Sequence, residues 1–276
     1  MNESLKRLLS GAVYVALLVV AAYHSDKGYS FYLLFGIFMI IAVYEFCQLI
    51  HLNKIAPIIL GTIAYCLATQ FRTNKTNDIL LLIATLFVSV KCLLLLFNSK
   101  KEKFDTLSKY TYTIGYVILP FIIITKIPFS YNSYRPNIII SIFILIWTND
   151  TFAYIVGKSI GKHKLIVRIS PKKTIEGFIG GIVFSIIAGI LISKFIFKPV
   201  QSYANTSILI WSISAIIIGI FSTLGDLIES KFKRIAGVKD SGNIMPGHGG
   251  ILDRLDSIIF VAPFVYLFYQ ILYYVS

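Results

Sequence analysis

Residues 206–228 read TSILIWSISAIIIGIFSTLGDLI, and Asp226 is the only charged side chain in this stretch. A transmembrane helix needs about 20 mainly apolar residues to cross the hydrocarbon core of a bilayer. The stretch is long enough to span a membrane, and an acid stands near its end. It therefore predicts a membrane-spanning helix that delivers a carboxylate to one edge of the membrane.

Eight further stretches have this length and character or come close to it. Together the nine stretches are residues 8–23, 30–50, 55–71, 79–97, 112–128, 137–157, 177–197, 206–228 and 258–275. The chain of 276 residues is 57% hydrophobic and only 14% charged, whereas soluble domains carry about 25% charged residues. We predict an all-α, polytopic integral membrane protein with about nine transmembrane helices. Residues 1–136 form its N-terminal region, and 137–276 form a C-terminal region with polar loops at 158–176 and 229–257.

The basic residues predict the orientation of these helices. The chain has 26 Lys and Arg against 13 Asp and Glu, a formal net charge of +13. With nine spans, eighteen of the basic residues fall on the side of the N-terminus and seven on the other side. Because cytoplasmic loops carry the excess of Lys and Arg, we predict a cytoplasmic N-terminus, with both polar loops on that side. The excess of positive charge is then explained by basic loops on the cytoplasmic side of the membrane, and we expect no nucleic-acid partner.

The acids are confined in the second half of the chain. After Asp105 only seven remain, and all lie in two segments: Asp150, Glu176, Asp226, Glu229, Asp240, Asp253 and Asp256. A carboxylate near the end of an apolar span is costly unless it is paired, binds a cation or meets water. One such acid is most simply a helix-end residue. Seven acids in two segments on one side favour a cation or phosphate site.

The second segment places carboxylates on two helix ends. If the eighth span continues, Asp226, Glu229 and Ser230 share one helix face. Asp253 and Asp256 are three residues apart at the expected start of the ninth span. Two such ends together would form an oxygen-rich pocket suited to a divalent cation.

A glycine-rich turn precedes the ninth span. Gly249 and Gly250 would let backbone N–H groups approach a phosphate at a helix N-terminus. The alternative is a basic juxtamembrane loop with ordinary capping acids. That alternative does not account for acids interleaved with the Lys and Arg residues of 229–257.

The first segment contains the run SPKKTIEG at residues 170–177. The Ser-Pro pair predicts a helix that begins at Ser170, with Thr174 and Glu176 in its first turns. The adjacent Lys172 and Lys173 suit phosphate oxygens. By themselves they would be an anchor for the seventh span, but their place beside the acids favours ligands.

At this point the chain resembles a known family. The runs Ser230-x-Phe-Lys-Arg, Lys239-Asp-x-Gly and Pro246-x-His-Gly-Gly-Ile-x-Asp-Arg-Leu-Asp256 are similar to the pattern of phosphatidate cytidylyltransferases (CDP-diacylglycerol synthases). The run at 170–177 and the Asp150-Thr-x-Ala-Tyr run resemble the same family. One departure is Met245, where the family usually has Leu, Ile or Phe. The strong matches cover roughly 149–181 and 222–257.

The resemblance implies transfer of CMP from CTP to the phosphate of phosphatidic acid, giving CDP-diacylglycerol and pyrophosphate. It implies a multi-pass enzyme of the cell membrane, of the bacterial inner-membrane type, with a cytoplasmic site, a requirement for Mg²⁺ and stimulation by K⁺. The metal ligands carried over are Asp226 and Asp253, then Asp256 and Asp150. The catalytic residues carried over are Lys239, Asp240, His248 and Arg254, and the substrate-binding residues are Ser170, Lys172, Lys173, Thr174, Ser230, Gly249 and Gly250.

Several alternatives stay open. His248 is either a phosphate partner or a turn residue, and Asp240 either joins the metal ligands or contacts substrate. The oligomeric state is not determined, and a homodimer is one candidate. A sister enzyme that activates another lipid phosphate, such as an archaeal ether lipid, shares the same chemistry.

An ion transporter is the alternative from another class. It predicts acids near the middle of several spans and paired half-repeats. Only Glu45 lies well inside a span, and we interpret it as a buried structural acid without a role in the site. A CDP-alcohol phosphotransferase would need an Asp-Gly-x-x-Ala-Arg motif, which the chain lacks.

Overall fold

The computed structural model describes residues 3–24, 27–70, 74–98, 104–130, 133–199, 201–245 and 249–275. The α-helices are α1 (Glu3–Tyr23), α2 (Tyr29–Leu49), α3 (Ile55–Gln70), α4 (Lys75–Phe97), α5 (Thr106–Tyr112), α6 (Leu119–Lys126), α7 (Pro136–Ile160), α8 (Ile175–Ile192), α9 (Ala204–Ala236) and α10 (Leu252–Val275). A π-helical turn, η1 (Thr113–Ile118), joins α5 to α6, a second, η2 (Ser193–Phe197), extends α8, and a 3₁₀ turn, η3 (Gln201–Tyr203), precedes α9. Two short antiparallel hairpins pair β1 (Phe129–Ser130) with β2 (Ser133–Tyr134) and β3 (Lys164–Ile166) with β4 (Ser170–Thr174).

Where the structure describes them, each of the nine apolar stretches is mainly helical. Within the described residues, seven helical segments are long and apolar enough to cross a membrane: 29–49, 75–97, 106–126, 136–160, 175–197, 204–236 and 252–272. Two apolar helices, Leu9–Tyr23 and Ile55–Gln70, are shorter. The prediction of an all-α membrane protein is therefore confirmed, while the count of nine spans stays a prediction.

The connections gather at two ends of the helix bundle, which the length of α4 separates. Near the start of α4, Asp78 forms a 2.9 Å ion pair with Lys126 at the end of α6. Just beyond the other end of α4, the carbonyl of Asn98 accepts hydrogen bonds from Arg168 of the β3–β4 turn (2.9 Å) and from Lys231 of α9 (2.8 Å). The connections before α4 and after α6 thus lie at one end of the bundle, and those after α4 and after α7 lie at the other. This is the arrangement expected of helices that run alternately up and down.

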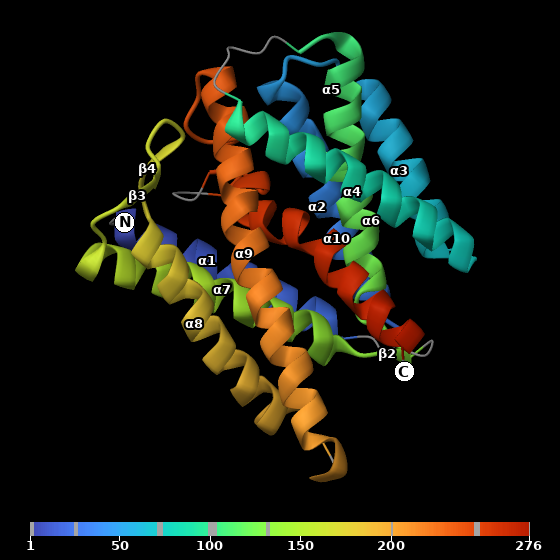
Figure 1. Ribbon diagram of the computed structural model, residues 1–276. Helices are drawn as coiled ribbons and strands as arrows, with labels where there is room; N and C mark the ends of the chain where they lie inside the picture. Colours follow the sequence, from blue (N-terminus) through green and yellow to red (C-terminus); the bar gives the residue numbers. More distant parts are fainter. Residues whose placement is uncertain are drawn as a thin grey trace.

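The helices α7, α8, α9 and α10 form the part of the bundle that carries the motifs (Figure 1). The helix α8 packs against α7 and α9, and α9 packs against α10. Gly181 of α8 and Gly219 of α9 approach the buried Asn149 of α7 so closely that an added Cβ would lie 2.6 and 3.2 Å from its side-chain oxygen. Small residues allow such close helix approach in membranes. This close packing lets the Asn149 amide donate a hydrogen bond to the Ser222 hydroxyl of α9 at 2.9 Å.

The prediction that a helix begins at Ser170 is wrong. Residues Ser170–Thr174 form β4, in which Thr174 lies opposite Lys164 and Ser170 lies opposite Ile166. The helix α8 begins at Ile175, and its N-cap is Thr174, whose hydroxyl accepts a hydrogen bond from the Gly177 amide at 3.1 Å. Proline lacks an amide donor but fits the edge of a sheet, and every strand of a two-stranded hairpin is an edge. The Ser-Pro signal was therefore equally compatible with a strand.

We expect Thr174→Val to loosen the junction between β4 and α8. Valine keeps the shape of threonine but removes the cap of the Gly177 amide, and a lost N-cap costs about 1 kcal/mol. Tryptic cleavage at Lys172 and Lys173, measured on the detergent-solubilised protein, should become faster. Thr174→Ser keeps the hydroxyl and is the matched control. Equal cleavage of Thr174→Val and wild type would contradict the capping role.

Candidate active site

The hairpin β3–β4 and the end of α9 meet in an ion pair. Lys173 of β4 places its Nζ 2.6 Å from Oδ2 of Asp226 in α9. The Ser230 hydroxyl, one turn further along α9, donates to the other oxygen of Asp226 at 3.3 Å. Two segments that lie about 50 residues apart in the sequence are thus brought into one site.

This geometry depends on the length of α9. The helix runs 33 residues, to Ala236, so Asp226, Glu229 and Ser230 belong to one continuous helix. It ends where Gly237 adopts a positive φ of 72° and the amide of Val238 bonds to the carbonyl of Lys233 at 3.0 Å. This is the glycine-ended pattern that satisfies the last carbonyls of a helix.

Asp150 reaches the same site from α7. Its side chain accepts a hydrogen bond at 3.3 Å from Asn149, which also bonds to Ser222 of α9. Asn149 was not expected to be functional. Its signal in the sequence is an amide beside an acid within an apolar stretch, because a buried amide needs polar partners.

Asp256 brings a third carboxylate to the site, from α10. It is 8% exposed, and its Oδ1 accepts a 2.7 Å hydrogen bond from the Ser257 amide. Asp226 and Asp150 both act electrostatically on Asp256, and Lys173 and Arg254 act on Asp150. Acids from three helices therefore lie close enough to affect one another electrostatically, with cations beside them.

Asp253 has a different environment from the other three predicted ligands. Its Oδ1 lies 2.7 Å from Lys233 Nζ, and its Oδ2 accepts from the Ser241 amide (2.9 Å), the Ser241 hydroxyl (2.9 Å) and the Gly250 amide (2.7 Å). Lys233 also bonds to Glu229 at 2.5 Å. Oδ2 of Asp253 thus holds the segment before α10, and Oδ1 pairs with Lys233 of α9.

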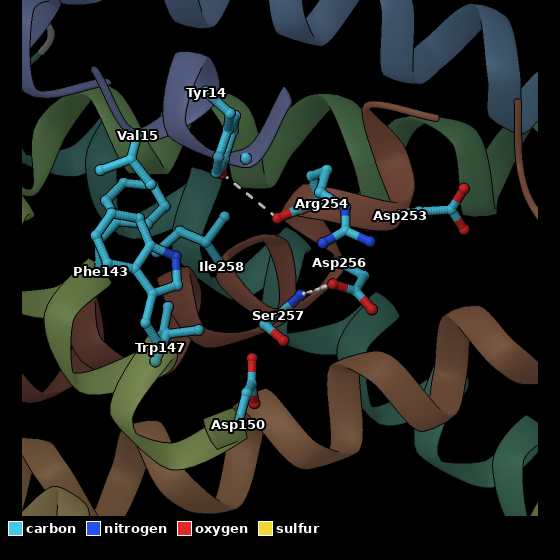
Figure 2. A pocket seen from close by; sticks show the side chains of 12 residues that line it. Tyr14, Val15, Phe143, Trp147, Asp150, Asp253, Arg254, Asp256, Ser257 and Ile258 are labelled. Atoms are coloured by element: carbon cyan, nitrogen blue, oxygen red, sulfur yellow. Dashed lines mark hydrogen bonds between the residues drawn. The ribbon is translucent and has the colours of Figure 1, made fainter. Parts of the chain in front are cut away.

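A cavity of about 270 Å³ adjoins the acids. Its polar lining is Asp150, Asp253, Arg254, Asp256 and Ser257, and its apolar lining is Gly11, Tyr14, Val15, Phe143, Ile146, Trp147 and Ile258. Figure 2 shows the rings of Phe143 and Trp147 across the cavity from Arg254, and the Asp253 carboxylate turned away from Asp150. The contribution of α1, through Tyr14 and its neighbours, was not predicted from the sequence. A cavity with one charged side and one apolar side suits a molecule with an anionic head and an apolar body.

The acids fit a magnesium ion that is bound together with a phosphate. Among the described residues, no group of three His, Cys, Asp or Glu side chains is placed to share a metal ion. Magnesium requires fewer protein ligands, because it usually binds one or two carboxylates and completes its shell with waters and substrate phosphates. Asp226, Asp256 and Asp150 offer such oxygen ligands, and the hydrogen bonds of Asp253 make it the least suited of the four.

The remaining predicted residues are more scattered. Lys172, Lys239 and Asp240 are exposed, Ser170 is half-buried at the start of β4, and Thr174 is buried as the cap of α8. Gly249 has a positive φ of 85° and pairs with Met245 in an antiparallel bridge. The Gly250 amide is used by Asp253. His248 lies outside the described residues.

Comparison with known proteins connects this arrangement to a family. The model of the cytidylyltransferase family matches residues 5–272. Three similar proteins are each named phosphatidate cytidylyltransferase: one from Staphylococcus haemolyticus is 54% identical over 121 residues, and those from Staphylococcus saprophyticus and Staphylococcus aureus (strain COL) are 50% identical over 123 residues. These alignments span 44% of this chain and 44% of each relative. Because the family model covers nearly the whole sequence, the chain belongs to the cytidylyltransferase family.

Proposed function

We propose that the protein is a phosphatidate cytidylyltransferase, which joins CTP and phosphatidic acid to give CDP-diacylglycerol and pyrophosphate. The observation that carries the proposal is the cavity, in which acids and Arg254 face an apolar wall, beside the Lys173–Asp226 pair. A nucleotide and a lipid phosphate need such a site, because both reacting groups are anionic and only one has an apolar body. The names of the relatives agree with this substrate pair.

The chemistry requires little acid–base catalysis from the protein. The phosphate of phosphatidic acid is already an anion, so its oxygen can attack the α-phosphate of CTP in line with the leaving pyrophosphate. Mg²⁺, when bound, would neutralise charge on the phosphate oxygens, and one or two of Asp226, Asp256 and Asp150 would hold it. K⁺ is proposed as an additional activating ion.

The cations of the chain bind and orient the substrates in this proposal. Lys173 would exchange its bond to Asp226 for one to a phosphate oxygen, and the neighbouring Lys172 would bind the same group. Arg254 would hold the lipid phosphate at the polar side of the cavity, because a guanidinium matches phosphate oxygens in pairs. Lys239, Asp240 and His248 remain predicted catalytic residues.

We further propose that the site lies at the cytoplasmic face of the cell membrane. The Tyr23 hydroxyl at the end of α1 bonds to Asn137 at the start of α7, which supports antiparallel α1 and α7. The start of α1 then lies at the end of the bundle that carries the β3–β4 hairpin. A cytoplasmic N-terminus, as the basic residues predict, gives the site access to CTP.

The purified protein should transfer label from α-labelled CTP to phosphatidic acid in the presence of Mg²⁺. We expect one pyrophosphate to be released for each lipid-linked CMP formed. A parallel assay with an ether-lipid phosphate tests the sister activity, and ion flux into liposomes tests the transporter alternative. Absence of both lipid-linked CMP and pyrophosphate would overturn the proposal.

We expect Asp226→Asn to abolish turnover, and chelation by EDTA to do the same in the wild type until Mg²⁺ is restored. An amide is a weaker ligand for a hard cation, so the loss should exceed about 100-fold. Asp78→Asn, which removes a carboxylate at the opposite end of α4, should retain activity and is the control. Activity of Asp226→Asn near that of the wild type would eliminate it as a ligand.

We expect Trp147→Leu to weaken binding of the lipid but not of the nucleotide. Trp147 forms part of the apolar wall, and loss of part of an aromatic contact should raise the KM for phosphatidic acid about tenfold. The KM for CTP should stay unchanged. Phe152→Leu changes an aromatic residue of the same helix that stacks on Phe184 instead, and it should leave both KM values unchanged. Equal increases in both KM values for Trp147→Leu would contradict a lipid-binding wall.

A further inference from the structure

Glu45 of α2 is a buried acid that the proposed reaction does not use. It is 1% exposed. Its Oε1 accepts a hydrogen bond from the Ile251 amide at 3.1 Å, and its Oε2 accepts one from the Leu252 amide at 2.8 Å. The Ser241 hydroxyl also donates to Oε2, at 3.4 Å. All three partners lie about 200 residues further along the chain, in the segment that leads into α10.

The two amides belong to the start of α10, which begins at Leu252. The first N–H groups of a helix have no partner within the helix, and the helix dipole makes this end attractive to a carboxylate. Glu45 therefore acts as an N-cap supplied by another helix. The Gly250 amide bonds to Asp253, so three successive amides, from Gly250 to Leu252, are held by two carboxylates.

The surrounding segment is shaped around this carboxylate. A Cβ added to Gly242 or to Gly250 would overlap the Glu45 side-chain oxygens. Ser241 joins the two carboxylates, because its hydroxyl lies within hydrogen-bonding distance of Glu45 (3.4 Å) and of Asp253 (2.9 Å). Loss of the Glu45 charge would weaken the hydrogen bonds to two buried amides. The close approach of Gly242 and Gly250 leaves little space around the side chain for a rearrangement that would replace them.

We propose that Glu45 is a positioning residue that fixes the first turn of α10 against the rest of the site. The start of α10 carries Arg254 and Asp256, which line the cavity together with Asp150 of α7. The expected effect on catalysis rests on the proposed function. The contact between Glu45 and the start of α10 is independent of it. With both oxygens bonded and almost no exposure, Glu45 acts through α10 rather than on the substrates.

Glu45→Gln is the first test, because glutamine has the same shape but presents an NH₂ group to one of the two amide donors. We expect kcat to fall about 10- to 100-fold, the range seen when groups that orient ligands are removed, with both KM values within about twofold. Hydrogen exchange at Ile251 and Leu252 should become faster. Glu45→Asp keeps the charge one methylene further away and should recover part of the lost kcat.

Met39→Ala separates positioning from general stability. Met39 is a buried core residue of the same helix, so this variant should lower the thermal midpoint without changing kcat or exchange at Ile251 and Leu252. Gly242→Ala disturbs the same carboxylate from the loop and should reproduce the kcat loss. If Glu45→Gln does not fold, the kcat of Gly242→Ala tests the positioning role of Glu45 in its place.

The outcomes distinguish this inference from the proposed function. If the wild type transfers no CMP, the proposed function fails, and hydrogen exchange in Glu45→Gln alone decides whether Glu45 holds the start of α10. If the wild type is active and Glu45→Gln keeps its kcat and its slow exchange, the inference is overturned. A kcat loss in Met39→Ala equal to that in Glu45→Gln would also overturn it, because stability would then explain both. A lower kcat in both Glu45→Gln and Gly242→Ala, with faster exchange at Ile251 and Leu252 in Glu45→Gln, supports the inference.

Discussion

The structure depends on how it compensates carboxylates placed at the ends of apolar helices. Such a group is costly unless it is paired or hydrogen-bonded. Asp226 is paired with Lys173 of the β3–β4 hairpin, and Asp253 with Lys233. Glu45 instead accepts hydrogen bonds from the backbone amides of Ile251 and Leu252 at the start of α10. Each of these interactions joins segments that are distant in the sequence, so the compensation of charge also assembles the site.

The contacts divide the acids by what they can do. Asp253 and Glu45 hold the segment before α10, because their oxygens accept hydrogen bonds from it. Asp150, Asp226 and Asp256, from α7, α9 and α10, lie close enough to affect one another electrostatically. Mutual repulsion among carboxylates is relieved when a cation binds between them. The proposed site for two anionic substrates would gain from this arrangement, because preorganised charges need not move as the reaction proceeds.

Sequence patterns predicted where most helices begin and end, but they did not predict which side chains from distant segments contact one another. The continuation of α9 through Ser230 and the start of α10 just before Asp253 followed from apolar length, residue spacing and the glycine-rich turn. The start predicted at Ser170 was wrong, because the local Ser-Pro signal does not contain the cross-strand pairing with Lys164–Ile166 that makes β4. The roles of Asn149, Glu45 and the wall from α1 were missed, since each is defined by contacts with distant helices.

Hydropathy and charge along the chain were enough to predict membrane-length helices with the later acids in two segments, because both are properties of consecutive residues. The family pattern at 230–256 was equally visible there, with Met245 as a conservative departure. The folded structure was needed to show that Lys173 meets Asp226, that Lys233 of α9 pairs with Asp253, and that Glu45 caps α10 from another helix. These contacts depend on how buried polar groups find partners across the bundle, and the two members of each pair lie at least 20 residues apart in the sequence.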